Sequence, residues 1–176
     1  MQLKFQSTKG TNATSVTYNP YANVYYSCIA GNADFPLEVF SGDNGSVIKS
    51  TAAGIDLRGL WWNADKTRIE VTTHPDISVA YCNVTGFGIP EAESEPTGVS
   101  IMHDDNNAVP AFYPKKKQLI YFTGTEFHFF NLKNGKKSTI VKLPQSISPD
   151  KLNSNVVIFT GVPNNELGVL NYQDRE

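Results

Sequence analysis

The amino-acid sequence predicts an all-β fold built from four-stranded antiparallel meanders. Three times an aromatic residue is followed by a polar turn and then by a run of β-branched and aromatic residues, at Tyr18, Trp62 and Phe112. Ile147 opens a weaker fourth copy. Repetition of this kind is typical of an array of similar supersecondary units. No segment shows the sustained 3.6-residue period of an amphipathic helix, so we expect little or no helix.

Composition and charge narrow the classes of partner. The chain has 176 residues, a formal charge of −2 and 18% charged residues. So small a net charge creates no field that would attract nucleic acid, and no apolar run is long enough for a membrane-spanning helix. We therefore expect neither a nucleic-acid partner nor a membrane partner. The many Asn, Thr and Tyr residues and the few lysines favour an extracytoplasmic or secreted location.

The first unit, at about 13–54, is the clearest. The pair Asn44-Gly45 predicts a hairpin between its last two strands, because Asn-Gly readily adopts positive φ. We expect its strands at 15–18, 24–30, 37–41 and 47–51.

The next two units follow the same plan. The second, at about 56–103, has expected strands at 60–62, 68–72, 79–84 and 99–102, with an acidic, Pro-containing surface loop at 86–96. The third, at about 107–144, repeats the hairpin signal at Asn134-Gly135. Its expected strands are 109–112, 119–123, 127–132 and 139–143.

The fourth unit, at about 145–176, is incomplete. We expect strands near 146–148, 156–160 and 166–172, and then the chain stops where an outer strand should follow. Residues 2–8 read as a lone strand ahead of the first unit. We therefore expect the N-terminal segment to supply the missing strand and to close the array, which leaves no open sheet edges between the first and last units.

Two motifs resemble those of β-propellers. The pattern aromatic-Asn-Pro-x-x-Asn-x-Tyr-Tyr at 18–26 resembles the first two strands of YVTN-type blades. The stretch Ile-Ser-Pro-Asp-Lys at 147–151 resembles a turn of WD-repeat and TolB-like blades. The resemblance implies a monomeric, four-bladed propeller in one domain, and it does not identify a subfamily. The alternative is that the chain is part of a larger propeller, or that two chains assemble into one.

The resemblance also implies where a ligand would bind. Propeller ligands usually bind at the rim formed by the loops that enter the innermost strands. Asp56 and Arg58 lie two residues apart on one strand, so their side chains should face the same way and form an ion pair or hold a carboxylate-bearing ligand. The candidate ligand-binding residues of this rim are Asn12, Asp56, Arg58, His103, Asp104, Asp105 and Gln145.

The segment His103-Asp104-Asp105-Asn106 is the densest polar cluster of the sequence. Carboxylate and amide oxygens suit Ca²⁺ or Mg²⁺, which makes Asp104 and Asp105 candidate metal ligands. The alternative is a solvated turn, because Asp and Asn tolerate turn dihedral angles. Since the spacing matches no defined metal loop, we predict no cofactor, with Ca²⁺ or Mg²⁺ as the alternative.

Aromatic residues and cysteines allow two interpretations each. Trp61 and Trp62 are neighbours, so on a strand they point to opposite faces; both pack in the core, or one is a stacking platform for a sugar or peptide. Cys28 and Cys82 lie in apolar runs and are expected to be buried thiols, the alternative being a disulfide between units. We expect His74 in a plain turn, no ligand role for His128, and a solvated basic turn at 115–117.

No catalytic motif is present in the sequence, and no catalytic residue is predicted. We therefore predict a non-catalytic binding module that presents its loops to a protein, peptide or glycan partner. The alternative is a metal-dependent hydrolase or lactonase-like enzyme whose cation lies at the channel mouth, near Asp104 and Asp105.

Overall fold

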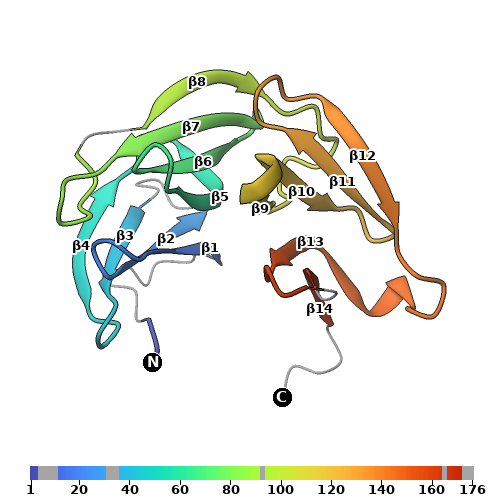
Figure 1. The fold of residues 1–176 in the computed structure, drawn as a ribbon, viewed down its shortest axis with the longest axis horizontal. Helices are drawn as coiled ribbons and strands as arrows, with labels where there is room; N and C mark the ends of the chain where they lie inside the picture. The colour runs from blue at the N-terminus through green and yellow to red at the C-terminus, as the bar shows by residue number, and fades with distance from the viewer. Residues whose placement is uncertain (4–11, 31–35, 92–93, 164–165, 172–176) are drawn as a thin grey trace. The chain divides into compact units, whose positions relative to one another are not determined.

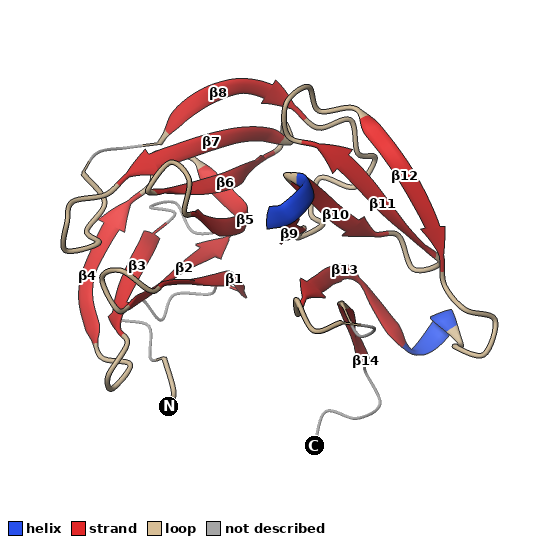
Figure 2. Ribbon diagram, viewed as in Figure 1, coloured by secondary structure: helices blue, strands red, loops and turns tan. Residues whose placement is uncertain are grey.

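A computed structural model describes residues 1–3, 12–30, 36–91, 94–163 and 166–171 of the chain. The chain consists of two compact units, Met1–Gly98 and Val99–Glu176, and each is described by itself. Strands joined by short turns make up both units (Figures 1 and 2). The described helices are two 3₁₀ turns of three residues each, as the absence of a helical period in the sequence predicts.

The first sheet of unit 1 is a meander in which each strand pairs with the next one along the chain. All three pairs are antiparallel, and the outermost strand is largely exposed. Its strands are β1 (Asn12–Asn19), β2 (Val24–Ala30), β3 (Pro36–Ser41) and β4 (Val47–Ala52).

The second sheet has the same order, with β5 (Asp56–Asn63), β6 (Arg68–His74), β7 (Ser78–Asn83) and β8 (Glu95–Ser100). The last strand is expected at 99–102 but begins earlier, at Glu95. The Tyr81 hydroxyl donates to the Glu95 carboxylate at 2.6 Å and the Thr97 hydroxyl donates to the Val79 carbonyl at 2.7 Å, and both bonds hold β8 to β7. The strand β8 therefore starts inside the surface loop predicted at 86–96. Met102 is exposed and lies outside the strand.

The two sheets of unit 1 share one hydrophobic core. The Ser15 hydroxyl of β1 bonds the Leu60 backbone of β5, and the Thr17 hydroxyl accepts a hydrogen bond from the Trp62 N–H at 3.0 Å. Burial of each large apolar side chain stabilises the fold by about 1.5–3 kcal/mol. The core includes Leu37, Val39, Leu57, Ile69, Val71 and the buried thiols Cys28 and Cys82.

Unit 2 contains a third meander with the same strand order. A 3₁₀ turn, η1 (Pro114–Lys116), joins its first two strands. The second strand is largely buried, whereas every residue of the outermost strand is exposed. Its strands are β9 (Ala111–Tyr113), β10 (Gln118–Phe122), β11 (Glu126–Asn131) and β12 (Lys137–Lys142).

The fourth sheet has two strands among the described residues, β13 (Leu152–Phe159) and β14 (Leu167–Asn171). The strand predicted at 146–148 is wrong: the Ile147 N–H bonds the Pro144 carbonyl at 2.9 Å in a turn, and η2 (Pro149–Lys151) follows. Proline has no N–H to donate to a sheet. Of the predicted N-terminal strand, residues 2 and 3 form no strand, and 4–8 lie outside the described residues.

Both predicted Asn-Gly hairpins are present, and their main-chain bonds are equivalent. Gly45 N–H donates to the Ser41 carbonyl at 2.9 Å, and Gly135 N–H donates to the Asn131 carbonyl at 2.8 Å. Both glycines have positive φ, which favours glycine at these positions. The pairing register also slips at the same point in each sheet, after Val39 in the first and after Phe129 in the third.

The chain is therefore an all-β protein of repeated four-stranded antiparallel meanders, the sheet architecture of β-propeller blades, which confirms the predicted fold class. Closure of the array, the number of blades and the domain boundaries stay predictions.

Candidate functional site

Asp56 and Arg58 face the same way from β5, and the structure brings them together. The Arg58 guanidinium lies 2.5 Å from one carboxylate oxygen of Asp56, and His74 Nδ1 lies 3.4 Å from the other. The side chains of Arg58 and Asp56 are 10% and 12% exposed. His74, expected in a plain turn, ends β6 directly opposite Asp56 and so joins the pair. A ligand role for this ion cluster stays a prediction.

Three further residues of the predicted rim lie elsewhere: Asn12 at the start of a strand, and Asp104 and Asp105 in a turn. Asn12 begins β1 opposite Ala30, and the loop before it lies outside the described residues. Asp104 is exposed, and Asp105 accepts a hydrogen bond from the Asn107 N–H at 2.9 Å, as in a polar turn. Among the described residues, no three His, Cys, Asp or Glu side chains form a group that could hold a metal ion. The proposed Ca²⁺ or Mg²⁺ ligation by Asp104 and Asp105 stays a prediction.

His103 differs from its neighbours because its ring is half-buried. It stacks on Tyr121 with ring centroids 4.3 Å apart and meets Phe130 edge-on. Nδ1 bonds the Asp105 backbone at 3.1 Å, while the buried Nε2 has no hydrogen-bond partner in the described part of the chain. Burial lowers the pKa of His103, and the nearby His128 lowers it further, against the opposing effect of the Asp105 backbone. The structure thus favours a neutral imidazole in an aromatic setting.

Gln145 is exposed and lines an open pocket of about 390 Å³ in unit 2. The wall is formed by the end of β12, the start of β11 and the turn before η2, with Pro144, Ile147 and Glu126 among its residues. Because the predicted site residues are divided between the two units, their convergence on one rim stays a prediction.

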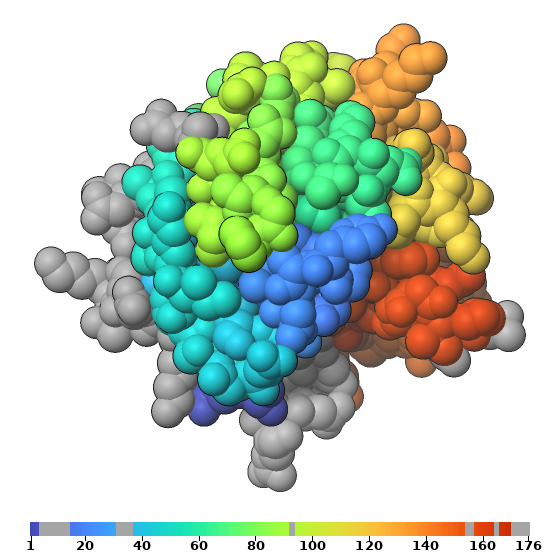
Figure 3. Space-filling view, turned by 60° about the vertical axis from the view of Figure 1, so that its left-hand side comes forward, coloured from blue at the N-terminus to red at the C-terminus, as the bar shows by residue number. Residues whose placement is uncertain are grey.

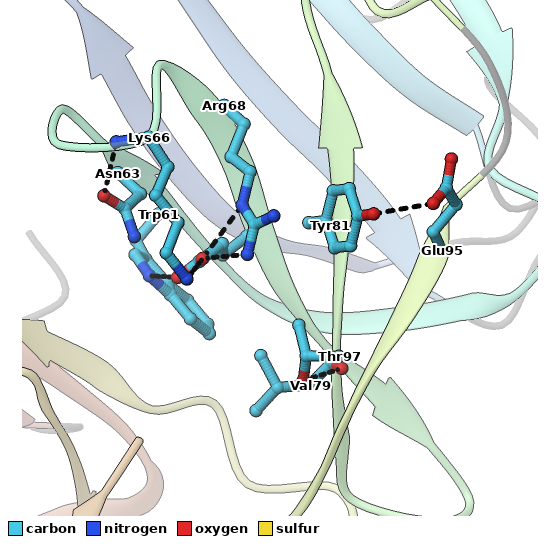
Figure 4. Close-up of polar contacts among 9 residues, drawn as sticks. Trp61, Asn63, Lys66, Arg68, Val79, Tyr81, Glu95 and Thr97 are labelled. Carbon is cyan, nitrogen blue, oxygen red and sulfur yellow. Dashed lines mark hydrogen bonds and ion pairs between the residues drawn. The ribbon is translucent and has the colours of Figure 1, made fainter. Parts of the chain in front are cut away.

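A mostly buried charge cluster lies on β5 and β6 of the second sheet, with Lys66 in the turn between them (Figure 4). Trp61 Nε1 donates to one Glu70 oxygen at 3.1 Å, and Arg68 lies 2.6 Å from the other. Burial raises the pKa of Glu70, but hydrogen bonds from Asn63 and Arg68 and the charges of Arg68 and Lys66 outweigh it, so its pKa is lowered. The Glu70 carboxylate therefore stays charged and holds β5 and β6 together. The sequence reading missed this cluster.

Both tryptophans are buried, so the core interpretation is confirmed and neither is a platform. Two other aromatic side chains in unit 1 are highly exposed instead. Tyr21, in the β1–β2 turn, is 74% exposed, and Phe87, in the turn that follows β7, is 86% exposed. These two turns touch, because a Cβ on Gly88 would lie 2.8 Å from the Ala22 Cβ. Figure 3 shows the blue and yellow-green surfaces of these segments in contact.

One buried residue connects the two turns. The hydroxyl of Tyr26, which is fully buried, donates to the Gly88 carbonyl at 2.7 Å and accepts from Asn19 Nδ2 at 3.1 Å. Asn19 Oδ1 in turn accepts the Tyr21 N–H at 3.0 Å. Burial raises the pKa of Tyr26, which keeps the phenol protonated as a donor. We call the surface formed by Tyr21, Phe87 and these turns the aromatic turn surface.

The Phe87 turn is also fixed from within. The Thr85 hydroxyl accepts hydrogen bonds from the N–H groups of Phe87 and Ile89, at 3.3 and 3.2 Å. The Thr85 and Ile89 backbones also bond each other at 2.8 Å. The exposed ring of Phe87 therefore stands on an ordered backbone. The sequence predicted Phe87 in a surface loop, but it did not reveal that the backbone of this turn is ordered.

No protein-family model and no curated protein matches this chain. Among the described residues, no helix has the length and apolar character needed to span a bilayer.

Two solved structures are similar to this chain. The β-propeller domain of Myceliophteria thermophila Cps50 (Swd1) has a TM-score of 0.46 and 12% identity, covering 81% of this chain and 49% of its own. A Bacteroides caccae protein of unknown function has a TM-score of 0.43 and 18% identity, covering 77% of this chain and 47% of its own. The chain therefore spans about half the length of both structures.

Proposed function

We propose that this protein is a non-catalytic binding module that takes a protein, peptide or glycan partner on the aromatic turn surface of unit 1. The observation that supports the proposal is the exposure of Tyr21 and Phe87 on backbones that a buried hydrogen-bond chain holds in place. Large aromatic side chains contribute strongly to binding when a partner covers them.

Preorganisation strengthens the argument. Ordering a loop on binding costs free energy, so a surface whose turns are ordered beforehand keeps more of its interaction energy. Asn19 and Thr85 each order one turn, and Tyr26 links the two. Such an arrangement places the functional side chains on a rigid support.

The predicted rim residues Asp56 and Arg58 support a binding role less well than the aromatic turn surface does. Asp56 and Arg58 already satisfy each other's charge in a mostly buried pair, and His74 faces the same carboxylate. A ligand would have to break this pair before it could use either charge, and loss of one partner of a buried pair is costly. The aromatic turn surface needs no such rearrangement.

The test is a binding screen with the full chain. A random peptide phage library and a panel of immobilised oligosaccharides are probed with the parent protein and with Tyr21→Ala and Phe87→Ala. Met102→Ala, at a similarly exposed apolar residue of unit 2, is the matched control. All variants are first compared by circular dichroism and thermal melting.

We expect hits whose affinity falls about tenfold or more in Tyr21→Ala and Phe87→Ala and stays unchanged in Met102→Ala. If the hits bind both aromatic variants as tightly as the parent, or if neither library yields a hit, the proposal is overturned.

A further inference from the structure

We infer that the ligand of the aromatic turn surface is a neutral oligosaccharide. This inference rests on the proposed function and names the class of ligand for the same surface. It comes from a second feature, a chain of polar side chains whose central member, Asn23, lies in the same turn as the exposed Tyr21.

The polar chain is made of three exposed side chains, one from the end of β1 and one each from the β1–β2 and β3–β4 turns. The Tyr18 hydroxyl donates to Asn23 Oδ1 at 2.8 Å, and Asn23 Nδ2 donates to Asp43 Oδ1 at 2.7 Å. Tyr18 also packs its ring on Tyr25, with centroids 4.7 Å apart. The three polar groups are thereby held in fixed positions while they remain open to solvent.

The backbone fixes the centre of this chain. Asn23 has a positive φ of 52°, and its carbonyl accepts the Gly42 N–H at 2.8 Å. A Cβ on Gly42 would overlap the Asn23 side chain, so the β1–β2 and β3–β4 turns are in contact here. The Asn23 amide is therefore presented by two turns that support each other, and it lies two residues after Tyr21 in the sequence.

This combination matches the chemistry of a pyranose ring. One face of the ring presents apolar C–H groups, which pack against an aromatic side chain, and its edge presents hydroxyls that both donate and accept hydrogen bonds. Asn23 keeps one amide hydrogen and further acceptor capacity on Oδ1, and Asp43 keeps a second carboxylate oxygen. Tyr21 and Phe87 supply the aromatic faces, and the polar chain supplies the hydroxyl partners.

The negative charge of the polar chain favours a neutral saccharide over an anionic one. Asp43 is the single charge of the polar chain, and it is negative. An anionic saccharide would place like charges together, which is unfavourable, whereas the hydroxyls of a neutral saccharide can donate to this carboxylate. A protein partner would more often meet a contiguous apolar core than an aromatic and a polar side chain exposed on one turn, as Tyr21 and Asn23 are.

The experiment titrates the ¹⁵N-labelled full chain with neutral oligosaccharides (glucose-, mannose- and N-acetylglucosamine-based tetramers), with an oligogalacturonate as the anionic probe, and with any peptide selected from the library. Variants Asp43→Ala and Tyr18→Phe remove polar groups of the chain, and Tyr21→Ala and Phe87→Ala remove the aromatic faces. Asp150→Ala, at an exposed aspartate of unit 2, is the matched control.

We expect a neutral tetramer to shift the amides around residues 18–23, 42–44 and 85–89. Its affinity should fall about tenfold in the aromatic variants and several-fold in Asp43→Ala, and should not change in Asp150→Ala. Peptide binding that Tyr21→Ala abolishes, without saccharide binding, overturns this inference and leaves the proposed function standing. Tighter binding of the oligogalacturonate overturns the neutral class, and no binding of any probe overturns both proposals.

Discussion

The hydroxyl of Tyr26 donates a hydrogen bond to the Gly88 carbonyl at 2.7 Å, although 62 residues separate them in the chain. The same oxygen accepts a hydrogen bond from Asn19, which orders the neighbouring turn. One phenol thus fixes the relative position of two turns from different sheets of unit 1.

Tyr26→Phe tests this link. The variant leaves the buried Gly88 carbonyl and the Asn19 amide each without a partner, so we expect a loss of about 1–3 kcal/mol in the free energy of unfolding. Urea denaturation followed by circular dichroism measures the loss. Tyr25→Phe serves as the control, because the Tyr25 ring is only half-buried. A Tyr26→Phe protein as stable as the parent would contradict the role of the hydroxyl.

Glu70 should make stability depend on pH in the acidic range. Its pKa is lowered because hydrogen bonds and charges from Asn63, Arg68 and Lys66 outweigh burial. A lowered carboxyl pKa gives stability that is present above the ordinary glutamate pKa and is lost as pH falls through the native pKa. We expect Glu70→Gln to cost about 1–3 kcal/mol at pH 7 and much less at pH 3.

The measurement is urea denaturation of the parent and Glu70→Gln at both pH values. Glu91→Gln, at an exposed carboxylate of the same unit, is the control and should leave stability unchanged. An equal loss at pH 7 and pH 3 would mean that Glu70 contributes through packing rather than through its charge.

His103 should give a second, separate pH dependence. Burial lowers its pKa, so the unfolded chain binds a proton more readily than the native protein does. Stability is therefore present above the ordinary histidine pKa and is lost as pH falls through the native pKa. We expect the unfolding free energy of the parent to decline between pH 7.5 and pH 5, and His103→Gln to flatten this decline. An unchanged slope in the variant would assign the effect to another group.

Gly135→Ala should destabilise unit 2 strongly. Gly135 has a φ of +67°, and an added Cβ would overlap the Ser100 carbonyl oxygen. Gly98→Ala is a matched control, because Gly98 also has a positive φ but has open space around it. Backbone strain alone costs about 1 kcal/mol, so we expect the control to lose about that much and Gly135→Ala to lose clearly more. Thermal melting compares the two, and equal losses would show that the overlap is relieved.

The sequence predicted the elements whose signals are local. Runs of β-branched and aromatic residues marked the strands, and Asn44-Gly45 and Asn134-Gly135 marked two hairpins that the structure confirms. The expected strand at 146–148 failed because prolines on both sides favour a turn over sheet pairing. Local pattern therefore predicted most of the fold.

The candidate site depends on contacts between distant residues, which local pattern does not reveal. Tyr26 lies in an apolar run and reads as an ordinary core residue, while its hydroxyl contact to Gly88 depends on how two sheets pack. His74 joins Asp56 only through the strand register. One signal was available: Phe87 lies between Gly86 and Gly88, and an aromatic residue between two glycines in a loop is a reason to expect an exposed ring.

The equivalent hairpins at Gly45 and Gly135 have a practical consequence for engineering. Segments 43–46 and 133–136 differ in sequence but lie in hairpins with equivalent backbone bonds, so each should be accepted in the other's place with little change in folding. Transplanting 133–136 into the first position would replace Asp43 with lysine while keeping Gly42, whose place against Asn23 has no room for a Cβ. It would thus separate the contribution of that carboxylate from the contribution of the loop that carries it.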